Sequence, residues 1–263
     1  MFRKNPKYKI IEFFSDVPKV RPNEMLFIPK DNRLMEVGPW QNSKKKPDWF
    51  ISQNRDEASI RTCYGTLDFI SLGITLPMWT NINVRLTPDG RDFELRGDPI
   101  STENPDGVVN RIEGFPASSI SACPFTEQRK INGHYPKLVT PWLIKTAPGW
   151  STLVLPQILD PNPNYTVMPG VIHTDYYHII NIVLSITTDK PFTIPIGQPM
   201  YQLIPFKRNK RGTKILEGNQ SMFRFLQGRG TGEHYLNNID RGNAYKREQR
   251  KADEALKKNR KDQ

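Results

Sequence analysis

Two histidines and an aspartate stand close together in the stretch PGVIHTDYYHIINIVLSI, which runs from Pro169 to Ile186. His173, Asp175 and His178 have side chains that bind metals and transfer protons. The apolar residues that follow predict a strand, in which side chains two positions apart lie on the same face. His173 and Asp175 are therefore expected to share one face and His178 to point the other way, which argues against three metal ligands from this strand.

A metal site could also take its third ligand from another part of the chain. The triplet His-Thr-Asp, with His173 and Asp175, fits half of the facial triad of non-haem Fe(II) oxygenases. His234 would be the distal ligand, and Arg241 would hold an acidic co-substrate. Because His-x-Asp is a very common triplet, it identifies a site only weakly. The sequence therefore predicts neither a metal nor another cofactor, with an iron site at His173, Asp175 and His234 as the alternative.

The chain is basic, because 38 lysines and arginines against 27 aspartates and glutamates give its 263 residues a net charge of +11. Such a charge favours nucleic acid, nucleotides or anionic assemblies as partners. Residues 242–263 carry part of the excess and have no apolar stripe. They are expected to form a solvated or disordered tail, or alternatively an arm that binds nucleic acid or an acidic partner.

The cysteine content and the hydropathy of the chain indicate the cellular compartment. Cys63 and Cys123 do not form a metal-type pair, and two thiols in a chain of this length favour a reducing environment. Cys63 has no evident partner base and is expected to be a buried structural thiol. The first apolar run is too short for a signal peptide, and no run is long enough to span a membrane. We expect a protein of the cytoplasm, or of a virus particle assembled in a host cell, without a membrane partner.

The N-terminal half combines helix and strand patterns. Apolar residues recur at helical spacing and predict one or two helices from about Asp56 to Leu72, with Gly73 as the stop signal. The run ITLPMWTNINVRL predicts a half-buried strand, and the Asp-Gly turn after it predicts a hairpin with FELRG. Residues 98–136 are polar and turn-rich, and no structure is predicted for them. The five tryptophans are expected to pack in the core or between domains, with a stacking platform for bases as the alternative.

From Leu138 onward the chain consists of short β-rich runs separated by proline and glycine turns. Closely spaced strands of this kind predict a compact barrel or sandwich. The expected fold class is mainly β, and α+β overall. We predict an α+β region over residues 1–137, a β domain over residues 138–241 and a basic tail over residues 242–263, with the first two packed together.

Two blocks in the β-rich half carry a family resemblance. The first has the pattern Gly-Val-Ile-x-x-Asp-Tyr, formed by Gly170, Val171, Ile172, Asp175 and Tyr176. The second has the pattern Phe-x-Ile-x-x-Gly-x-x-x-x-Gln-Leu, formed by Phe192, Ile194, Gly197, Gln202 and Leu203. In this order, and joined by an alternating strand, they resemble the dUTPase and dCTP-deaminase superfamily over residues 139–206. The resemblance implies a β-clip fold, a compact dUTPase-like barrel in the second half.

The chain departs from that family at the residues that carry out catalysis. Where dUTPases have the aspartate that activates water, this sequence has His173. The arginine and serines of the phosphate cradle should follow Gly149, where the sequence continues instead with LVLPQIL. Without them a triphosphate loses charge-assisted donors. The glycine-rich last motif has only an echo in residues 228–235.

The resemblance and its departures together predict a candidate pocket. His173, Asp175, Tyr176, Gly197 and Gln202 are expected to line a pocket or subunit groove for a nucleotide or nucleoside, with the His173 imidazole poised by the Asp175 carboxylate. In the family, the corresponding tyrosine packs under the deoxyribose.

The arrangement of the block CYGTLDFISLGITLPMWTNINV before a β-clip-like half is also similar to proteins of tailed phages and their bacterial relatives. With the departures from the dUTPase motifs, we expect a phage-type β-clip protein that has lost dUTPase catalysis. We expect a binding or structural role rather than an enzyme, with a second copy or neighbours in a particle as further partners. Three alternatives stay open: a structural component of the virion, an active nucleotide hydrolase or deaminase, and the Fe(II) oxygenase.

Overall fold

The computed structural model describes residues 17–30, 32–54, 59–90, 92–97, 112–115, 135–209, 213, 215–230, 250–251 and 254. They fall into two compact units, one within residues 1–38 and 77–208, the other within residues 39–76 and 209–263. The paired strands are antiparallel, which confirms the predicted mainly β class and fits a β-clip-like barrel. The boundaries expected at residues 137 and 241 stay a prediction.

The first unit contains a sheet built around the long strand β7 (Tyr135–Thr146). β1 (Met25–Pro29) and β11 (Ile179–Ile186) flank β7, and β6 (Ile112–Phe115) pairs with its first residues. β11 also pairs with β9 (Tyr165–Val167). Strands from the N-terminal half of the sequence thus complete a sheet of the second half.

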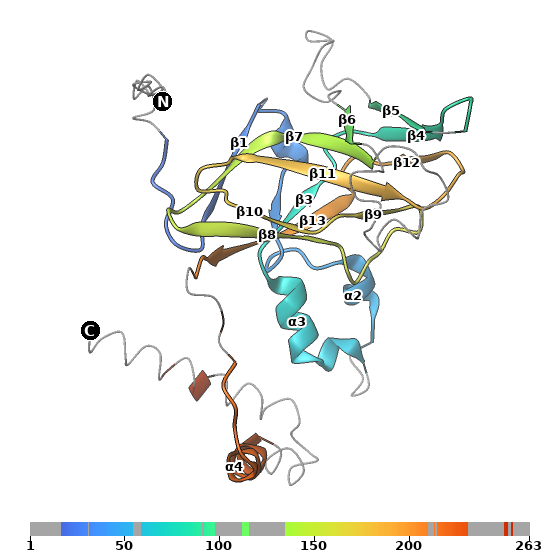
Figure 1. Ribbon diagram of the computed structural model, residues 1–263. Coiled ribbons are helices and arrows are strands. Elements are labelled where there is room, and N and C mark those ends of the chain that lie inside the picture. The colour runs from blue at the N-terminus through green and yellow to red at the C-terminus, as the bar shows by residue number, and fades with distance from the viewer. Residues whose placement is uncertain are drawn as a thin grey trace, which may run out of the picture. The chain divides into compact units, whose positions relative to one another are not determined.

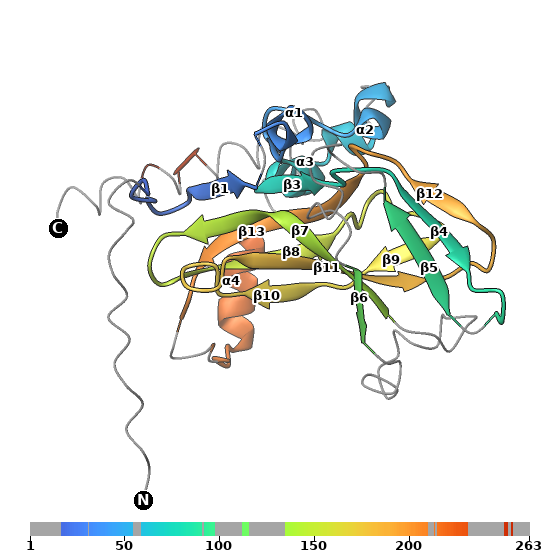
Figure 2. The same cartoon turned by 90° about the horizontal axis from the view of Figure 1, so that it is seen from above.

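A second sheet of this unit is centred on β8 (Trp150–Pro156). β8 pairs with β10 (Gly170–Ile172) on one side and with β13 (Pro199–Lys207) on the other. In Figures 1 and 2 this sheet lies against the sheet of β7 and β11, so the two form layers. A short helix, α1 (Leu34–Val37), belongs to the same unit.

The core of the first unit fills the space between these two layers. The Tyr201 hydroxyl on β13 donates to the backbone oxygen of Asn181 on β11, 3.3 Å away. Trp79 and Trp142 meet edge to face with ring centroids 5.9 Å apart, and both are buried. Aliphatic side chains from both sheets complete this core: Leu138, Ile144, Val154, Ile180, Ile182, Leu184 and Leu203. The other tryptophans are half-buried: Trp40, Trp49 and Trp150.

A third sheet of the first unit, seen side by side in Figure 2, joins β12 (Phe192–Ile194), β4 (Ile82–Leu86) and β5 (Phe93–Gly97). The predicted hairpin is confirmed, because β4 and β5 pair across the Asp-Gly turn. Gly90 in that turn has φ +67°, a conformation that glycine adopts without the steric cost other residues incur.

The single strand predicted from the run ITLPMWTNINVRL is two strands in the structure. β3 ends at Pro77 and β4 begins only at Ile82. Proline has no amide hydrogen to extend a strand ladder. The next residue, Met78, exchanges backbone hydrogen bonds of 2.8 Å with Gly197 and Gln198, which turns the chain out of the first strand.

The second unit contains a pair of short strands and several helices. β2 (Trp40–Gln41) pairs with β3 (Ile74–Pro77). The Asn42 side chain supports this pair, since its amide nitrogen donates to the Leu72 carbonyl at 2.7 Å and its oxygen accepts from the Thr75 hydroxyl at 2.6 Å. The helices of this unit are α2 (Asp48–Ser52), η1 (Ile60–Thr62), α3 (Tyr64–Ser71) and α4 (Gln220–Gly230).

The one or two helices predicted from about Asp56 to Leu72 are the 3-10 turn η1 and the helix α3. Asp56 itself lies outside the described residues. The Ser59 side chain accepts a hydrogen bond from the Arg61 amide and begins a single 3-10 turn, and the extended backbone of Cys63 separates that turn from α3. The stop signal is confirmed, because Gly73 follows the last helical turn with φ +67°.

Cys63 is exposed, so the prediction of a buried structural thiol is wrong. The residue lies between the 3-10 turn and α3, at the N-terminal cap position of the helix. A hydrogen bond with the Thr66 side chain lowers the pKa of its thiol. The pattern that suggested a core position was the lack of a partner base, which does not report on burial.

Some predicted features lie outside the described residues. They include Cys123 and most of the turn-rich segment 98–136, of which residues 112–115 and 135–136 are described as strand. Of the tail over residues 242–263, only residues 250, 251 and 254 are described. Within the described part of the chain, none of the helices is both long and apolar enough to cross a bilayer.

Candidate functional site

Residues 173–178 form the turn between β10 and β11, and they are not part of a strand. The expectation that His173 and Asp175 share a strand face is therefore wrong. The backbone amides of Tyr176 and Tyr177 both donate to the carbonyl of His173, at 3.2 and 2.9 Å, which closes the turn. The direction of each side chain here is therefore set by the geometry of the turn and by its own hydrogen-bond partners, and not by strand alternation.

Asp175 is held by an arginine from the far end of β13. Arg208 donates from both Nη1 and Nη2 to the two carboxylate oxygens, at 2.7 and 2.5 Å. The backbone amide of Gly149 donates to the same carboxylate at 2.9 Å. These donors, Arg208 first, lower the pKa of Asp175 to about 2 from an ordinary value of 3.8. The carboxylate is thus charged, paired and 10% exposed.

The same turn is fixed to the hairpin that joins β7 and β8. The Thr174 hydroxyl lies 2.8 Å from both the Thr146 and the Thr152 hydroxyls, and all three threonines are buried. Gly149 has φ +79° in the hairpin turn, and its carbonyl accepts from the Arg208 amide at 3.0 Å. The Gly149 turn is therefore part of the site, as a rigid support.

His173 makes its hydrogen bond with a serine and not with Asp175. Its Nδ1 lies 2.7 Å from the hydroxyl of Ser151, which is completely buried. Arg208 also donates to this hydroxyl, at 3.1 Å. The prediction that the Asp175 carboxylate poises the imidazole is wrong, because the two side chains bond to different partners. A buried hydroxyl of this kind orients the ring and is not accessible as a nucleophile.

Tyr176 presents its ring to solvent beside His173. Its ring centroid lies 5.6 Å from that of His173, with 43° between the planes, and 67% of the residue is exposed. The guanidinium carbon of Arg208 lies 5.8 Å from the Tyr176 ring, within the range of a cation–π contact. His173, Tyr176 and Arg208 together form a surface that we call the ring platform.

His178 has a structural position. Its Nδ1 lies 3.2 Å from the Ile144 carbonyl and 3.1 Å from the Thr174 carbonyl. Because carbonyl oxygens only accept hydrogen bonds, Nδ1 carries the proton. His178 thus fastens the turn to β7, away from the ring platform.

The structure does not bring Gly197 and Gln202 to the ring platform. Gly197 has φ +81° in the turn before β13, and Gln202 is buried within that strand opposite Leu155. Arg208 follows the other end of β13. At about 3.3 Å per residue, the strand separates the Gly197 turn from Arg208 by roughly 25 Å. The five candidate residues therefore lie at separate places in the fold.

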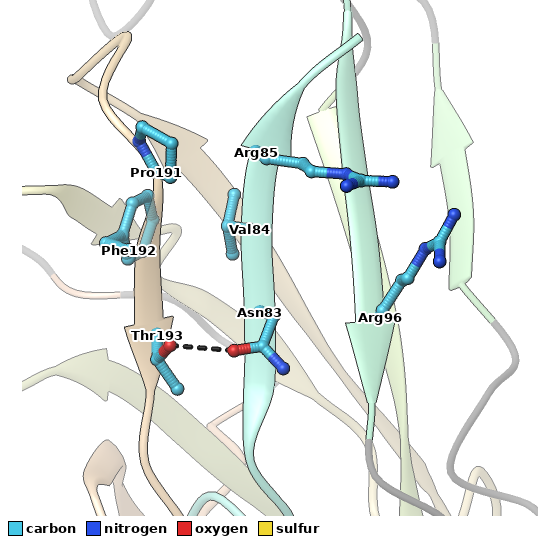
Figure 3. A pocket seen from close by; sticks show the side chains of 7 residues that line it. All are labelled: Asn83, Val84, Arg85, Arg96, Pro191, Phe192 and Thr193. Carbon is cyan, nitrogen blue, oxygen red and sulfur yellow. Dashed lines mark hydrogen bonds between the residues drawn. The ribbon is translucent and has the colours of Figure 1, made fainter.

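Two grooves lie apart from the ring platform. One, of about 280 Å³, lies on the outer face of β12, β4 and β5 and is drawn in Figure 3. The other, of about 130 Å³, is lined by segments 156–162, 165–167 and 198–200 and lies beside the Gly197 turn. Neither includes His173, Asp175 or Tyr176 among its lining residues.

The described residues contain no group of three histidine, cysteine, aspartate or glutamate side chains that could hold a metal. His234 and Arg241 of the alternative iron site lie outside the described residues. Arg208 was not predicted as a site residue. It follows the last strand of the barrel, 33 positions from Asp175, and no local pattern joins the two.

Comparisons with known proteins give structural neighbours alone. No protein-family model matches the sequence, and no curated protein matches it. The dUTPase of EIAV is 11% identical, with 56% of this chain and 85% of the dUTPase covered and a TM-score of 0.30. Two structures of the dUTPase from phage phi11 of S. aureus are 8% identical. They cover 75% and 76% of this chain and 99% of the dUTPase, with TM-scores of 0.35 and 0.34. Scores of this size carry no inference about what this chain does.

Proposed function

We propose that the ring platform binds a nucleoside, or the base and sugar of a nucleotide, and that the protein does not hydrolyse dUTP. The observation that carries this proposal is the fixed position of the Asp175 carboxylate, whose oxygens both accept from Arg208. His173 stands where the family's water-activating aspartate is expected, and Asp175, held in this way, is not free to take over that role. In this proposal the protein is a phage-type β-clip protein with a binding role.

The surroundings of His173 leave one ring nitrogen for a ligand, and the neighbouring strand lacks a phosphate cradle. The Nδ1 of His173 is occupied by Ser151, so Nε2 is the ring nitrogen left to face a ligand. Residues 153 and 154, which stand where the family's phosphate cradle is expected, belong to β8 and pair with β10 on one side and β13 on the other. A strand with two neighbours does not offer its amides to a triphosphate.

The exposed rings suit a flat, uncharged ligand. Stacking of a base on an aromatic side chain contributes about 1–3 kcal/mol and tolerates different bases. Tyr176 supplies the face, and His173 supplies one donor or acceptor beside it. Arg208 is already neutralised by Asp175, so the platform offers little attraction to phosphate. Recognition is therefore expected to depend on the base and sugar.

Replacing Tyr176 by Ala is expected to weaken nucleoside binding roughly 5- to 100-fold, because the variant cannot stack on the base. Isothermal calorimetry with deoxyuridine, thymidine, deoxycytidine and deoxyadenosine measures this directly. His173→Ala should also weaken binding, because its ring nitrogen can no longer bond the ligand. Tyr177→Ala is the matched control, because Tyr177 is an exposed neighbour that is not part of the ring platform.

Two results would contradict the proposal. One is that none of the four nucleosides binds at concentrations up to about 1 mM, where the binding free energy is only about 4 kcal/mol. The other is that binding is the same in the wild type and in both platform variants. In either case, the exposed rings would be surface residues without a ligand.

A further inference from the structure

The outer face of β12, β4 and β5 gathers hydrogen-bond donors in the larger groove. Cross-strand pairing aligns Thr193 with Asn83 and Asn83 with Arg96. One step further along the same face, Arg85 pairs with Glu94. Since side chains alternate along a strand, these residues share the exposed face, and the neighbouring apolar residues point into the core. Both of these cross-strand sets of side chains on the exposed face are therefore polar.

One carboxylate serves two arginines on this face. Arg85 donates from Nε to one oxygen of Glu94 at 2.7 Å, and Arg96 donates from Nε to the other oxygen at 2.6 Å. Each arginine places its Nη2 on the same oxygen as its Nε. These hydrogen bonds lower the pKa of Glu94, which is therefore ionised near neutral pH. Two positive charges against one negative charge leave the cluster with a net charge of +1.

The donors that remain point outward. Figure 3 shows the guanidinium groups of Arg85 and Arg96 turned toward one another, and their side chains are 54% and 67% exposed. Among the described residues, the Nη1 of each arginine has no hydrogen-bond partner. The Asn83 oxygen accepts from the Thr193 hydroxyl at 2.7 Å, so the Asn83 amide nitrogen is left as a further donor on the side of Arg96. The acceptors are satisfied within the protein, and the free groups are donors.

We propose that this groove binds phosphate groups of a nucleic acid strand, with Arg85 and Arg96 as the contacting residues. Guanidinium groups bind phosphate through paired N–H donors. A groove of about 280 Å³ is open along the sheet and accommodates more than an isolated anion. Two exposed arginines hold one phosphate weakly in water. A nucleic acid strand presents several phosphates, and it therefore binds a protein of net charge +11 more firmly than a single phosphate does.

The test uses fluorescence anisotropy of a labelled single-stranded oligonucleotide of about 20 nucleotides at several salt concentrations. Arg85→Ala/Arg96→Ala is expected to weaken binding about five- to tenfold at low salt. It should also reduce the slope of log affinity against log salt by about 1 for each phosphate that the variant no longer binds. Lys19→Ala is the matched control, because Lys19 is exposed and does not line the groove. A thermal melt checks that each variant is folded.

Glu94→Gln is expected to strengthen oligonucleotide binding, the opposite of the effect of the double arginine variant. It keeps the shape of the side chain and removes its charge, so the cluster gains one unit of positive charge. Oligonucleotide affinity should rise severalfold at low salt. A role of the three residues in stability alone would not produce tighter binding.

Competition identifies the source of the phosphate. Inorganic phosphate or a mononucleotide should displace the oligonucleotide only at millimolar concentration, about 4 kcal/mol of binding free energy. Displacement at micromolar concentration would overturn the proposal that the groove binds a nucleic acid strand and would indicate a small phosphorylated ligand. Equal oligonucleotide binding by the wild type, the double variant and Glu94→Gln would overturn the groove itself. These outcomes are independent of nucleoside binding at the ring platform, which uses different residues.

Discussion

Replacing Asp175 by Asn should lower the free energy of unfolding by about 2–3 kcal/mol at neutral pH. The substitution keeps the size of the side chain and removes its charge. Arg208 then loses its paired carboxylate while its side chain stays three-quarters buried, and the Gly149 amide loses a charged acceptor. Urea unfolding of the wild type and the variant measures the difference. Asp189→Asn, at an exposed position in the turn before β12, is the matched control and should change little.

The effect should depend on pH in a definite direction. The folded-state pKa of Asp175 is about 2, below the ordinary value of 3.8. A lowered pKa means that the folded state favours the charged form, so the stabilisation is fully present above about pH 4 and is lost as the pH falls toward 2. The difference between wild type and Asp175→Asn should therefore shrink between about pH 4 and pH 2. A difference that stays constant over this window would show that the charge of Asp175 is not what stabilises the turn.

The second large effect is expected in the core. Trp142→Ala should destabilise the protein by about 3–5 kcal/mol, because it removes a completely buried indole and its edge-to-face packing against Trp79. The neighbouring layers cannot close a space of this size, so a cavity remains. Chemical unfolding of the purified variant gives the value.

Trp142→Phe separates ring packing from hydrogen bonding. The Trp142 indole nitrogen is buried and has no hydrogen-bond partner among the described residues. Phenylalanine keeps an aromatic ring against Trp79 and removes this unpaired group, so it should cost clearly less than alanine. Equal destabilisation by Phe and Ala would instead show that the indole nitrogen makes a stabilising hydrogen bond.

Local chemistry explains which elements the sequence predicts correctly. The β4–β5 hairpin follows from an Asp-Gly pair between two alternating runs, and Gly90 has the positive φ that such a turn requires. The end of α3 follows from Gly73 for the same reason. Before it, Ser59 and Cys63 divide the apolar pattern into a 3-10 turn and a separate helix, in keeping with the one or two helices that the pattern predicts.

The candidate site depends on contacts between residues far apart in the sequence, and no sequence pattern predicted these contacts. His173, Asp175 and Tyr176 were identified from the family resemblance, but their directions were taken from strand periodicity, which does not apply in a turn. The partner of Asp175 is Arg208, and the partner of His173 is Ser151. Pairing of β8 with both β10 and β13 brings these residues together. That pairing is a property of the whole fold, and no spacing within one segment encodes it.

The central claim is that the ring platform recognises base and sugar without using the triphosphate. It is tested most directly by calorimetry of deoxyuridine and dUTP with Mg²⁺, accompanied by an assay for released pyrophosphate. Arg85→Ala/Arg96→Ala should be measured beside the wild type, so that phosphate binding at the groove does not contribute. We predict that the two ligands bind this variant within about threefold of each other, less than 1 kcal/mol, and that no pyrophosphate is released. Binding of dUTP at least about tenfold tighter, or turnover at an enzyme-like rate, would contradict the claim.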